Sequence, residues 1–198
     1  MTPAQRASLR QSLRHTRRLL SARQQRDAAI ALHHALAGQR FFRTAKRLAF
    51  YQAIDGEIDP SLLLAEALSR GQACFLPLLH PFRHGRLLFV RYRVGDPLQP
   101  NRWGIAQPRL LAHRLVSPRW LDVVLVPLVG FDADGNRLGM GKGFYDRTFS
   151  FRARSARRRP MLIGLAHECQ RVDVLERQDW DVTMDGIVSD KRWYEWRA

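Results

Sequence analysis

The chain has 198 residues, of which 45% are hydrophobic and 26% are charged, a composition typical of a soluble globular protein. This length favours a single domain over residues 1–198. No stretch approaches about 18 uncharged apolar residues, so we expect no membrane-spanning helix. The N-terminal segment MTPAQRASLR lacks the apolar region of a secretory signal.

The cysteines and the net charge indicate the cellular location and the kind of partner. Cys74 and Cys169 form no C-x-x-C motif and have no histidine-rich tract nearby. This argues against a zinc site or a disulfide framework and favours a cytoplasmic location. The formal net charge of +15 indicates an anionic partner, whether nucleic acid, nucleotide phosphates or a polycarboxylate substrate. Part of the charge lies in the arginine-rich segment 152–159, which is typical of a solvated loop.

Two helices are predicted at the N-terminus. Thr2 and Gln5 form a T-x-x-Q capping box with Pro3 at the first helical position. Ser21 repeats the box and begins a second helix that ends near Gly38. The first helix carries a basic stripe at i, i+3 and i+4 spacing, made of Arg6, Arg10, Arg14 and Arg17. From the spacing alone the stripe is either a solvated face or an anion-binding one.

Beyond residue 46 the pattern alternates between strands and helices. A leucine-rich helix opens at Asp59 and Pro60 and ends at Gly71, and another helix begins near Gly143. The strands are expected at residues 47–53, 73–79, 87–92, 123–129, 161–166 and 186–189, with 87–92 antiparallel to its neighbour. Residues 93–120 form a long irregular region with four prolines. The order predicts an α/β fold: an open, mostly parallel, Rossmann-like sheet flanked by helices in three layers, with the N-terminal helical pair added.

Ligands of such sheets bind beyond the carboxyl ends of the strands. This rule selects residues 52–57, 130–146 and 167–170 and the segment around Asp185.

The segment NRLGMGKGFYDR, residues 136–147, carries the most chemical information. Gly139, Gly141 and Gly143 alternate around Lys142, so backbone N–H groups and a cation can face an anion. The segment is neither a Walker A motif nor G-x-G-x-x-G. It is interpreted as a phosphate cradle, and the alternative is a glycine-rich turn kept for tight packing.

Several further side chains near these segments have both a functional and a structural interpretation. Asp146 and Asp185 could hold Mg²⁺ beside phosphates, or could serve as a helix N-terminal charge and a turn residue. Glu57 follows the Asp55-Gly56 turn and by default is a surface glutamate. Trp103 could stack on a flat ligand or close over the core. His167 could be catalytic, although a hydrogen-bonded residue at a strand end is more common.

Six stretches in this order resemble the 5-formyltetrahydrofolate cyclo-ligase (methenyltetrahydrofolate synthetase) family. They are RASLRQSLRHTRRLLS, FYQAIDGEIDPSLLL, WGIAQP, DVVLVPLVGFDADGNRLGMGKGFYDR, LIGLAHECQ and WDVTMDGIVSD. The fourth stretch is long and specific. The resemblance covers nearly the whole chain and implies an ATP-dependent ligase of folate metabolism.

The resemblance also implies roles for individual residues. The implied ATP-binding residues are Arg6, Arg10, Arg137, Leu138, Gly139, Met140, Gly141, Lys142, Gly143, Phe144 and Tyr145. Of these, Arg137, Lys142 and Tyr145 are also the expected catalytic residues. Gln52, Glu57 and Trp103 correspond to folate-binding positions, and Asp146 and Asp185 correspond to the ligands of Mg²⁺. Two positions depart from the family pattern: Phe144 replaces a common Tyr and Gln107 a common Glu.

The implied reaction converts 5-formyltetrahydrofolate into 5,10-methenyltetrahydrofolate, while ATP becomes ADP and phosphate through a phosphorylated formyl intermediate. The expected partner is this folate, with or without a polyglutamate tail, and the expected form is a cytoplasmic monomer that binds neither nucleic acid nor membrane. Two alternatives remain at this point. One is a nucleic-acid-binding module, which would show aromatic residues interleaved on a basic face. The other is a relative that acts on a different substrate or only regulates.

Overall fold

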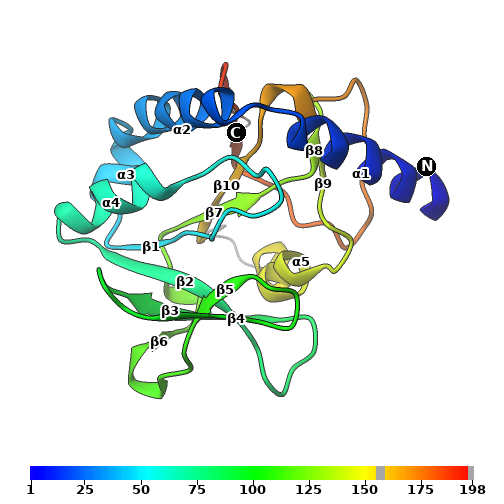
Figure 1. The fold of residues 1–198 in the computed structure, drawn as a ribbon. Helices are drawn as coiled ribbons and strands as arrows, with labels where there is room; N and C mark the ends of the chain where they lie inside the picture. Colours follow the sequence, from blue (N-terminus) through cyan, green and yellow to red (C-terminus); the bar gives the residue numbers. More distant parts are fainter. Residues whose placement is uncertain (155–158, 196–198) are drawn as a thin grey trace.

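The computed structural model describes residues 1–154 and 159–195. In this part of the chain the largest sheet has eight strands in the order β12-β11-β10-β7-β1-β2-β3-β6 (Figure 1). Its strands are β1 (Arg47–Ala49), β2 (Ala73–Leu79), β3 (Leu87–Tyr92), β6 (Leu115–Val116), β7 (Val123–Pro127), β10 (Met161–Leu165), β11 (Gly186–Val188) and β12 (Trp193–Glu195). Two small hairpins pair β4 (Leu98–Pro100) with β5 (Ala106–Pro108), and β8 (Gly130–Phe131) with β9 (Arg137–Leu138).

The middle of the sheet is parallel and its edges are antiparallel. Strands β11, β10, β7, β1 and β2 run in one direction, whereas β12, β3 and β6 run against their neighbours. Val123–Val126 in β7 is buried at every position, as expected for a central strand covered on both faces. The predicted open, mostly parallel α/β sheet is confirmed, and so is the antiparallel third strand.

Helices cover both faces of the sheet. They are α1 (Pro3–Arg18), α2 (Ala22–Ala37), α3 (Arg40–Thr44), α4 (Ser61–Ser69) and α5 (Phe144–Phe149). The helices α2, α3 and α4 pack on one face, where Leu32, Phe42 and Leu63 are fully buried. On the other face Phe149 of α5 packs with Phe89 of β3. The three-layer arrangement follows from these two separate cores.

The N-terminal helical pair is confirmed, and its first helix lies apart from the two layers. Both capping boxes, at Thr2 and Ser21, are formed. Leu13 of α1 packs with Val129 and Leu138 at the β8–β9 hairpin and not on the sheet face (Figure 1). This position brings the basic stripe of α1 over the ends of the central strands.

Some element boundaries differ from those expected. The first strand ends at Ala49 and not at residue 53, because Phe50 N makes its last bond to the Phe75 carbonyl before the chain turns away. The irregular region 93–120 contains the β4–β5 hairpin and β6. Within the arginine-rich segment, Arg152 is 5% exposed, so it is not part of a solvated loop, and residues 155–158 lie outside the described part. No described helix is long and apolar enough to cross a membrane.

Candidate active site

Segments from three central strands meet at one edge of the sheet. The Arg17 side chain joins two of them, because Nε donates to the Asp55 carbonyl at 2.8 Å and Nη1 donates to the Leu128 carbonyl at 3.2 Å. Gln170, which follows β10, also donates from Nε2 to the Leu128 carbonyl at 2.8 Å. The edge predicted from the strand ends is therefore confirmed for residues 52–57, 130–146 and 167–170.

Asp185 lies at the opposite edge, so its predicted place beside those segments is wrong. It precedes β11, which runs parallel to β10 with Gly186 opposite Ile163. Its carboxylate accepts hydrogen bonds from Arg152 at 2.8 and 2.6 Å and from Leu162 N at 2.7 Å. The strand-end rule selects residues that follow a strand, whereas Asp185 comes before one.

The Asp55 carboxylate gathers arginines from α1. It accepts hydrogen bonds from Arg14 Nε at 2.7 Å and Arg17 Nη2 at 3.2 Å, and Arg18 contacts its other oxygen. Burial alone would raise the pKa of Asp55, but the hydrogen bonds from Arg14 and Arg18 outweigh burial and hold the pKa below its usual value. Half of the basic stripe of α1 is thus bound to this loop and is not a solvated face.

The other half of the stripe faces the glycine-rich loop. Arg10 Nε donates to the Gly139 carbonyl at 2.9 Å, and a Cβ at Gly141 would lie 3.4 Å from the Arg10 guanidinium carbon. Arg6 lies one turn away, with Nη2 3.6 Å from Asp181. Burial and the neighbouring Arg6 lower the pKa of Arg10. Two crowded cations beside a glycine loop would be relieved by a bound anion.

The loop has a fixed backbone and a free charged tip. Gly141 and Gly143 have φ values of 84° and 62°, in the left-handed region that favours glycine. Arg147 donates from Nε to the Gly85 carbonyl at 3.0 Å and also contacts the Lys142 carbonyl. These two contacts hold the backbone of the loop at Lys142. The Lys142 side chain is exposed, and so is Met140. Leu138 is buried in the α1 contact, and its carbonyl accepts the Val129 N–H at 2.8 Å, so its role is structural.

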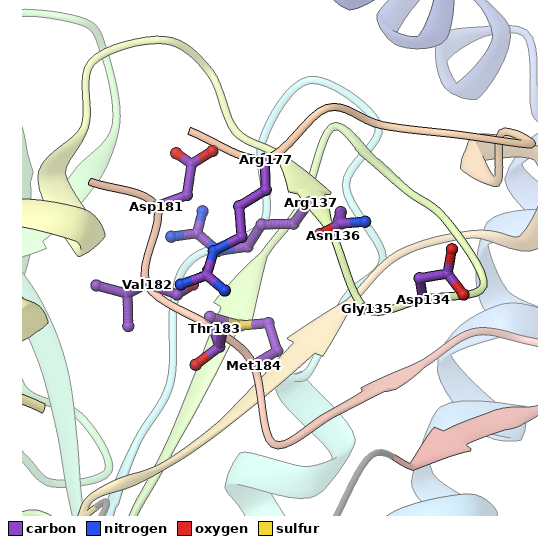
Figure 2. A pocket seen from close by; sticks show the side chains of 9 residues that line it. All are labelled: Asp134, Gly135, Asn136, Arg137, Arg177, Asp181, Val182, Thr183 and Met184. Atoms are coloured by element: carbon purple, nitrogen blue, oxygen red, sulfur yellow. The ribbon is translucent and has the colours of Figure 1, made fainter. Parts of the chain in front are cut away.

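Arg137 and Asp146 form a buried pair behind the loop. The Arg137 guanidinium contacts the Asp146 carboxylate and donates from Nε to the Val182 carbonyl at 3.2 Å. The same carboxylate oxygen accepts the Val182 N–H at 3.1 Å. Figure 2 shows Arg137 beside Arg177 in a pocket of about 150 Å³ between the β8–β9 hairpin and residues 177–184. Its lining carries two guanidinium groups and also the carboxylates of Asp134 and Asp181, so the formal charges of the pocket balance.

The two predicted metal ligands are each held by a different arginine. Among the described residues, no three His, Cys, Asp or Glu side chains are arranged to hold a metal ion. Mg²⁺ needs only one or two carboxylates when phosphate oxygens and waters complete its shell. The Oδ2 atom of Asp146 accepts no hydrogen bond within the described part of the chain, whereas both oxygens of Asp185 are engaged. Asp146 therefore fits the ion better than Asp185.

Glu57 is buried where the folate was expected, which contradicts its default interpretation as a surface residue. Its side chain is 7% exposed, and Oε1 lies 3.6 Å from Arg17 Nη2. Burial raises its pKa to about 7, although Arg17 acts in the opposite direction. Tyr145 of α5 interacts electrostatically with Glu57, and its own pKa is raised by burial and by this carboxyl group. The helix that follows the glycine loop thus runs close enough to Glu57 for the two side chains to interact electrostatically.

Aromatic residues lie at the start of α5, where Trp103 packs on Phe144. Trp103 meets Phe144 edge-on, with ring centroids 5.5 Å apart, and the Arg102 guanidinium lies 4.2 Å from its centroid. Trp103 is 41% exposed, so one part of its ring packs and another remains accessible. Gln107 accepts the Leu79 N–H at 3.3 Å, a structural use of the position where many relatives have Glu. Gln52 is half-buried in the segment between β1 and Glu57.

His167 and two residues missed by the sequence analysis complete the edge. His167 is 2% exposed, and its Nε2 has no hydrogen-bond partner in the described residues. Burial lowers its pKa. In the sequence Asp55 appeared only as a turn residue. In the structure its φ is 55°, a left-handed conformation that is uncommon for residues other than glycine. Arg177 lies in a stretch without periodicity, so no sequence signal could have found it.

Comparisons with known proteins identify the relatives of this chain. Residues 2–190 match the 5-formyltetrahydrofolate cyclo-ligase family. The chain is 36% identical to the 5-formyltetrahydrofolate cyclo-ligase of Haemophilus influenzae, over 95% of this chain and 99% of the relative. It is 35% identical to that of Escherichia coli K12, over 93% and 100%.

Solved structures agree with these matches. The NMR structure of Aquifex aeolicus 5,10-methenyltetrahydrofolate synthetase has a TM-score of 0.82 at 29% identity, covering 98% of this chain and 93% of that one. A Mycoplasma pneumoniae 5,10-methenyltetrahydrofolate synthetase shares the fold, with a TM-score of 0.71 at 24% identity over 93% and 98%. With a matching sequence, fold and order of site segments, this chain belongs to the 5-formyltetrahydrofolate cyclo-ligase family.

Proposed function

We propose that the protein uses ATP to cyclise 5-formyltetrahydrofolate into 5,10-methenyltetrahydrofolate, releasing ADP and phosphate. The formyl oxygen attacks the γ-phosphate of ATP, and the phosphorylated formyl group then reacts with N10 of the folate. The observation that carries the proposal is that the glycine loop, which Arg10 contacts, continues into the helix that lies near the buried Glu57. Tyr145 of this helix, α5, interacts electrostatically with Glu57.

The residues at this junction divide into two sets. Phosphoryl transfer depends on positioning and on neutralising charge more than on a protein nucleophile. Arg6, Arg10 and Lys142 supply positive charge around the glycine backbone. The folate side consists of Glu57, Gln52 and the exposed part of Trp103. In this assignment Tyr145 bridges the two substrates.

Arg137 acts in this proposal mainly through Asp146. Its guanidinium is 5% exposed and already paired, so it orients the carboxylate that would hold Mg²⁺ and adds charge behind the phosphates. Asp146 would hold the Mg²⁺ ion, which when bound would help neutralise the charge of the phosphates. Asp185 takes no part in this proposed site, because it lies at the opposite edge of the sheet and is paired with Arg152.

The test follows methenyltetrahydrofolate absorbance in the near ultraviolet with purified protein, 5-formyltetrahydrofolate and Mg-ATP. Signal growth should require both ATP and Mg²⁺. Lys142→Ala should lower the rate by about 100-fold, since a charged contact to a transferring phosphoryl group contributes a few kcal/mol. Lys46→Ala is the matched control, because Lys46 precedes β1 at the opposite edge of the sheet. No absorbance change with the wild-type protein would overturn the proposal.

We also propose that the enzyme acts as a cytoplasmic monomer, because the contacts that join the glycine loop, α1 and the Asp55 loop are all made within one protomer. Size-exclusion chromatography with light scattering would test this, and a stable dimer would contradict it. A polyglutamate tail remains compatible with the +15 charge. Arg152 is not available for such a tail, because it is buried against Asp185.

A further inference from the structure

Glu57 combines burial with spare hydrogen-bonding capacity. Oε2 accepts the Ile54 N–H at 3.2 Å, and Oε1 lies 3.6 Å from Arg17 Nη2, beyond hydrogen-bond distance. Arg17 directs its own hydrogen bonds to the carbonyls of Asp55 and Leu128 and to the Asp55 carboxylate. Glu57 is therefore close to a cation without being bound by it.

The groups that face Glu57 come from three elements. Arg17 and Arg14 of α1 favour its charged form, whereas Asp55 in its own loop favours the neutral form. Tyr51, which follows β1, and Tyr145 of α5 also interact with Glu57 electrostatically. Burial outweighs the arginines and raises the pKa of Glu57 to about 7. Near neutral pH both protonation states are populated, which suits a group that must take and return a proton.

The proposed reaction requires such a group in its second step. When N10 bonds to the activated formyl carbon, the carbon–oxygen bond breaks and phosphate leaves with that oxygen and the electron pair. N10 enters the step carrying one hydrogen and leaves it without one, so a proton must pass to a base.

We propose that the Glu57 carboxylate takes the N10 proton during ring closure, an inference that rests on the cyclo-ligase activity proposed above. The other acidic groups nearby are less suited. Arginines hold the Asp55 and Asp146 carboxylates. The pKa values of Tyr51 and Tyr145 are raised by burial, so these hydroxyls keep their protons.

Rapid-quench single turnover of Glu57→Gln, with enzyme in excess, tests this role by measuring ADP and methenyltetrahydrofolate separately. Phosphoryl transfer precedes loss of the N10 proton. We expect ADP formation to slow by less than tenfold and methenyl formation by about 100-fold, as is typical for loss of a general base. Glu66→Gln, at a paired glutamate on α4, should leave both rates unchanged. A substrate-binding role alone would slow both products by the same factor and would overturn the inference.

The pH profile gives a second, independent readout on the wild-type protein. The rate of ring closure should fall as the pH drops below about 7, and this acidic limb should be absent in Glu57→Gln. An identical limb in both proteins would contradict the role of Glu57. If the wild type forms neither ADP nor the methenyl product, the proposed function fails instead, so the two failures are distinguishable.

Discussion

Asp55 shows how one side chain can hold a site together. Its carboxylate contacts Arg14, Arg17 and Arg18, and Arg17 is fully buried. A buried cation without its counter-charge is costly. The φ of 55° at this position suits Asp or Asn better than most residues. The loop before Glu57 therefore depends on the charge at position 55 as much as on its backbone conformation.

Asp55→Asn keeps the shape and the left-handed preference while removing the charge. We expect the free energy of unfolding to fall by about 2–4 kcal/mol, because the buried Arg17 loses the carboxylate that accepts its hydrogen bond and keeps only the more distant Glu57 as a counter-charge. Urea denaturation would measure this. Asp27→Asn is the control, since its side chain is 67% exposed in an i,i+4 pair with Arg23, and its effect should stay below about 0.5 kcal/mol. An equal effect of both substitutions would show that Asp55 has no special role.

Glu57 gives a prediction about how the stability of the fold changes with pH. Burial raises the pKa of Glu57 in the folded protein to about 7 from its ordinary value of 4.5, so the folded state binds the proton more tightly. The stabilisation is complete below pH 4.5 and is lost as the pH rises through about 7. Between pH 5.5 and 8.5 the wild type should lose about 2 kcal/mol more than Glu57→Gln. Urea unfolding of both proteins at the two pH values would measure the difference, and parallel curves would contradict it.

At the scale of single residues, the sequence indicated which residues belong to the candidate site better than it indicated what each of them contacts. Glu57 was selected by resemblance, but its burial depends on Arg17, which is 40 positions away in the chain and reaches it only through the packing of α1. Asp185 was placed at the wrong edge because a short strand reveals its direction only through its partners. Such long-range relations are not present in local patterns.

Helix α1 is the element that connects the two halves of the site. Arg10 contacts the glycine loop, and one and two turns further on Arg14 and Arg17 contact the Asp55 loop. The sequence predicted the helix from its capping box and the stripe from its spacing. It left open whether the stripe was solvated, because spacing shows which residues share a face but not what the face meets. The β8–β9 hairpin that receives α1 was missed, since its strands have only two residues each.

Arg10→Ala tests the nucleotide end of this helix. The side chain is partly buried and lies on the Gly139 carbonyl, so its loss should raise the KM for ATP by about tenfold, which corresponds to about 1.4 kcal/mol. The KM for folate should change much less. Arg23→Ala on α2 is the control, because its side chain is 87% exposed. If the KM for folate rose more than the KM for ATP, Arg10 would belong to the folate side of the site and the prediction would fail.

For the molecule as a whole, the arrangement of α1 predicts that the two substrates bind cooperatively. The same helix holds the glycine loop through Arg10 and the folate loop through Arg14 and Arg17, and Tyr145 of α5 interacts electrostatically with Glu57. Ordering one loop by its ligand removes part of the cost of ordering the other. A non-hydrolysable ATP analogue should therefore tighten folate binding, by about tenfold within the usual range of coupling energies.

Isothermal titration calorimetry would measure this coupling in both directions, since linkage requires the folate to tighten analogue binding by the same factor. In Arg10→Ala the factor should shrink towards one, because the helix then holds only the folate loop. Equal folate affinity with and without the analogue would mean that the loops respond independently. A coupling that survived in Arg10→Ala would instead assign it to the electrostatic interaction between Tyr145 and Glu57.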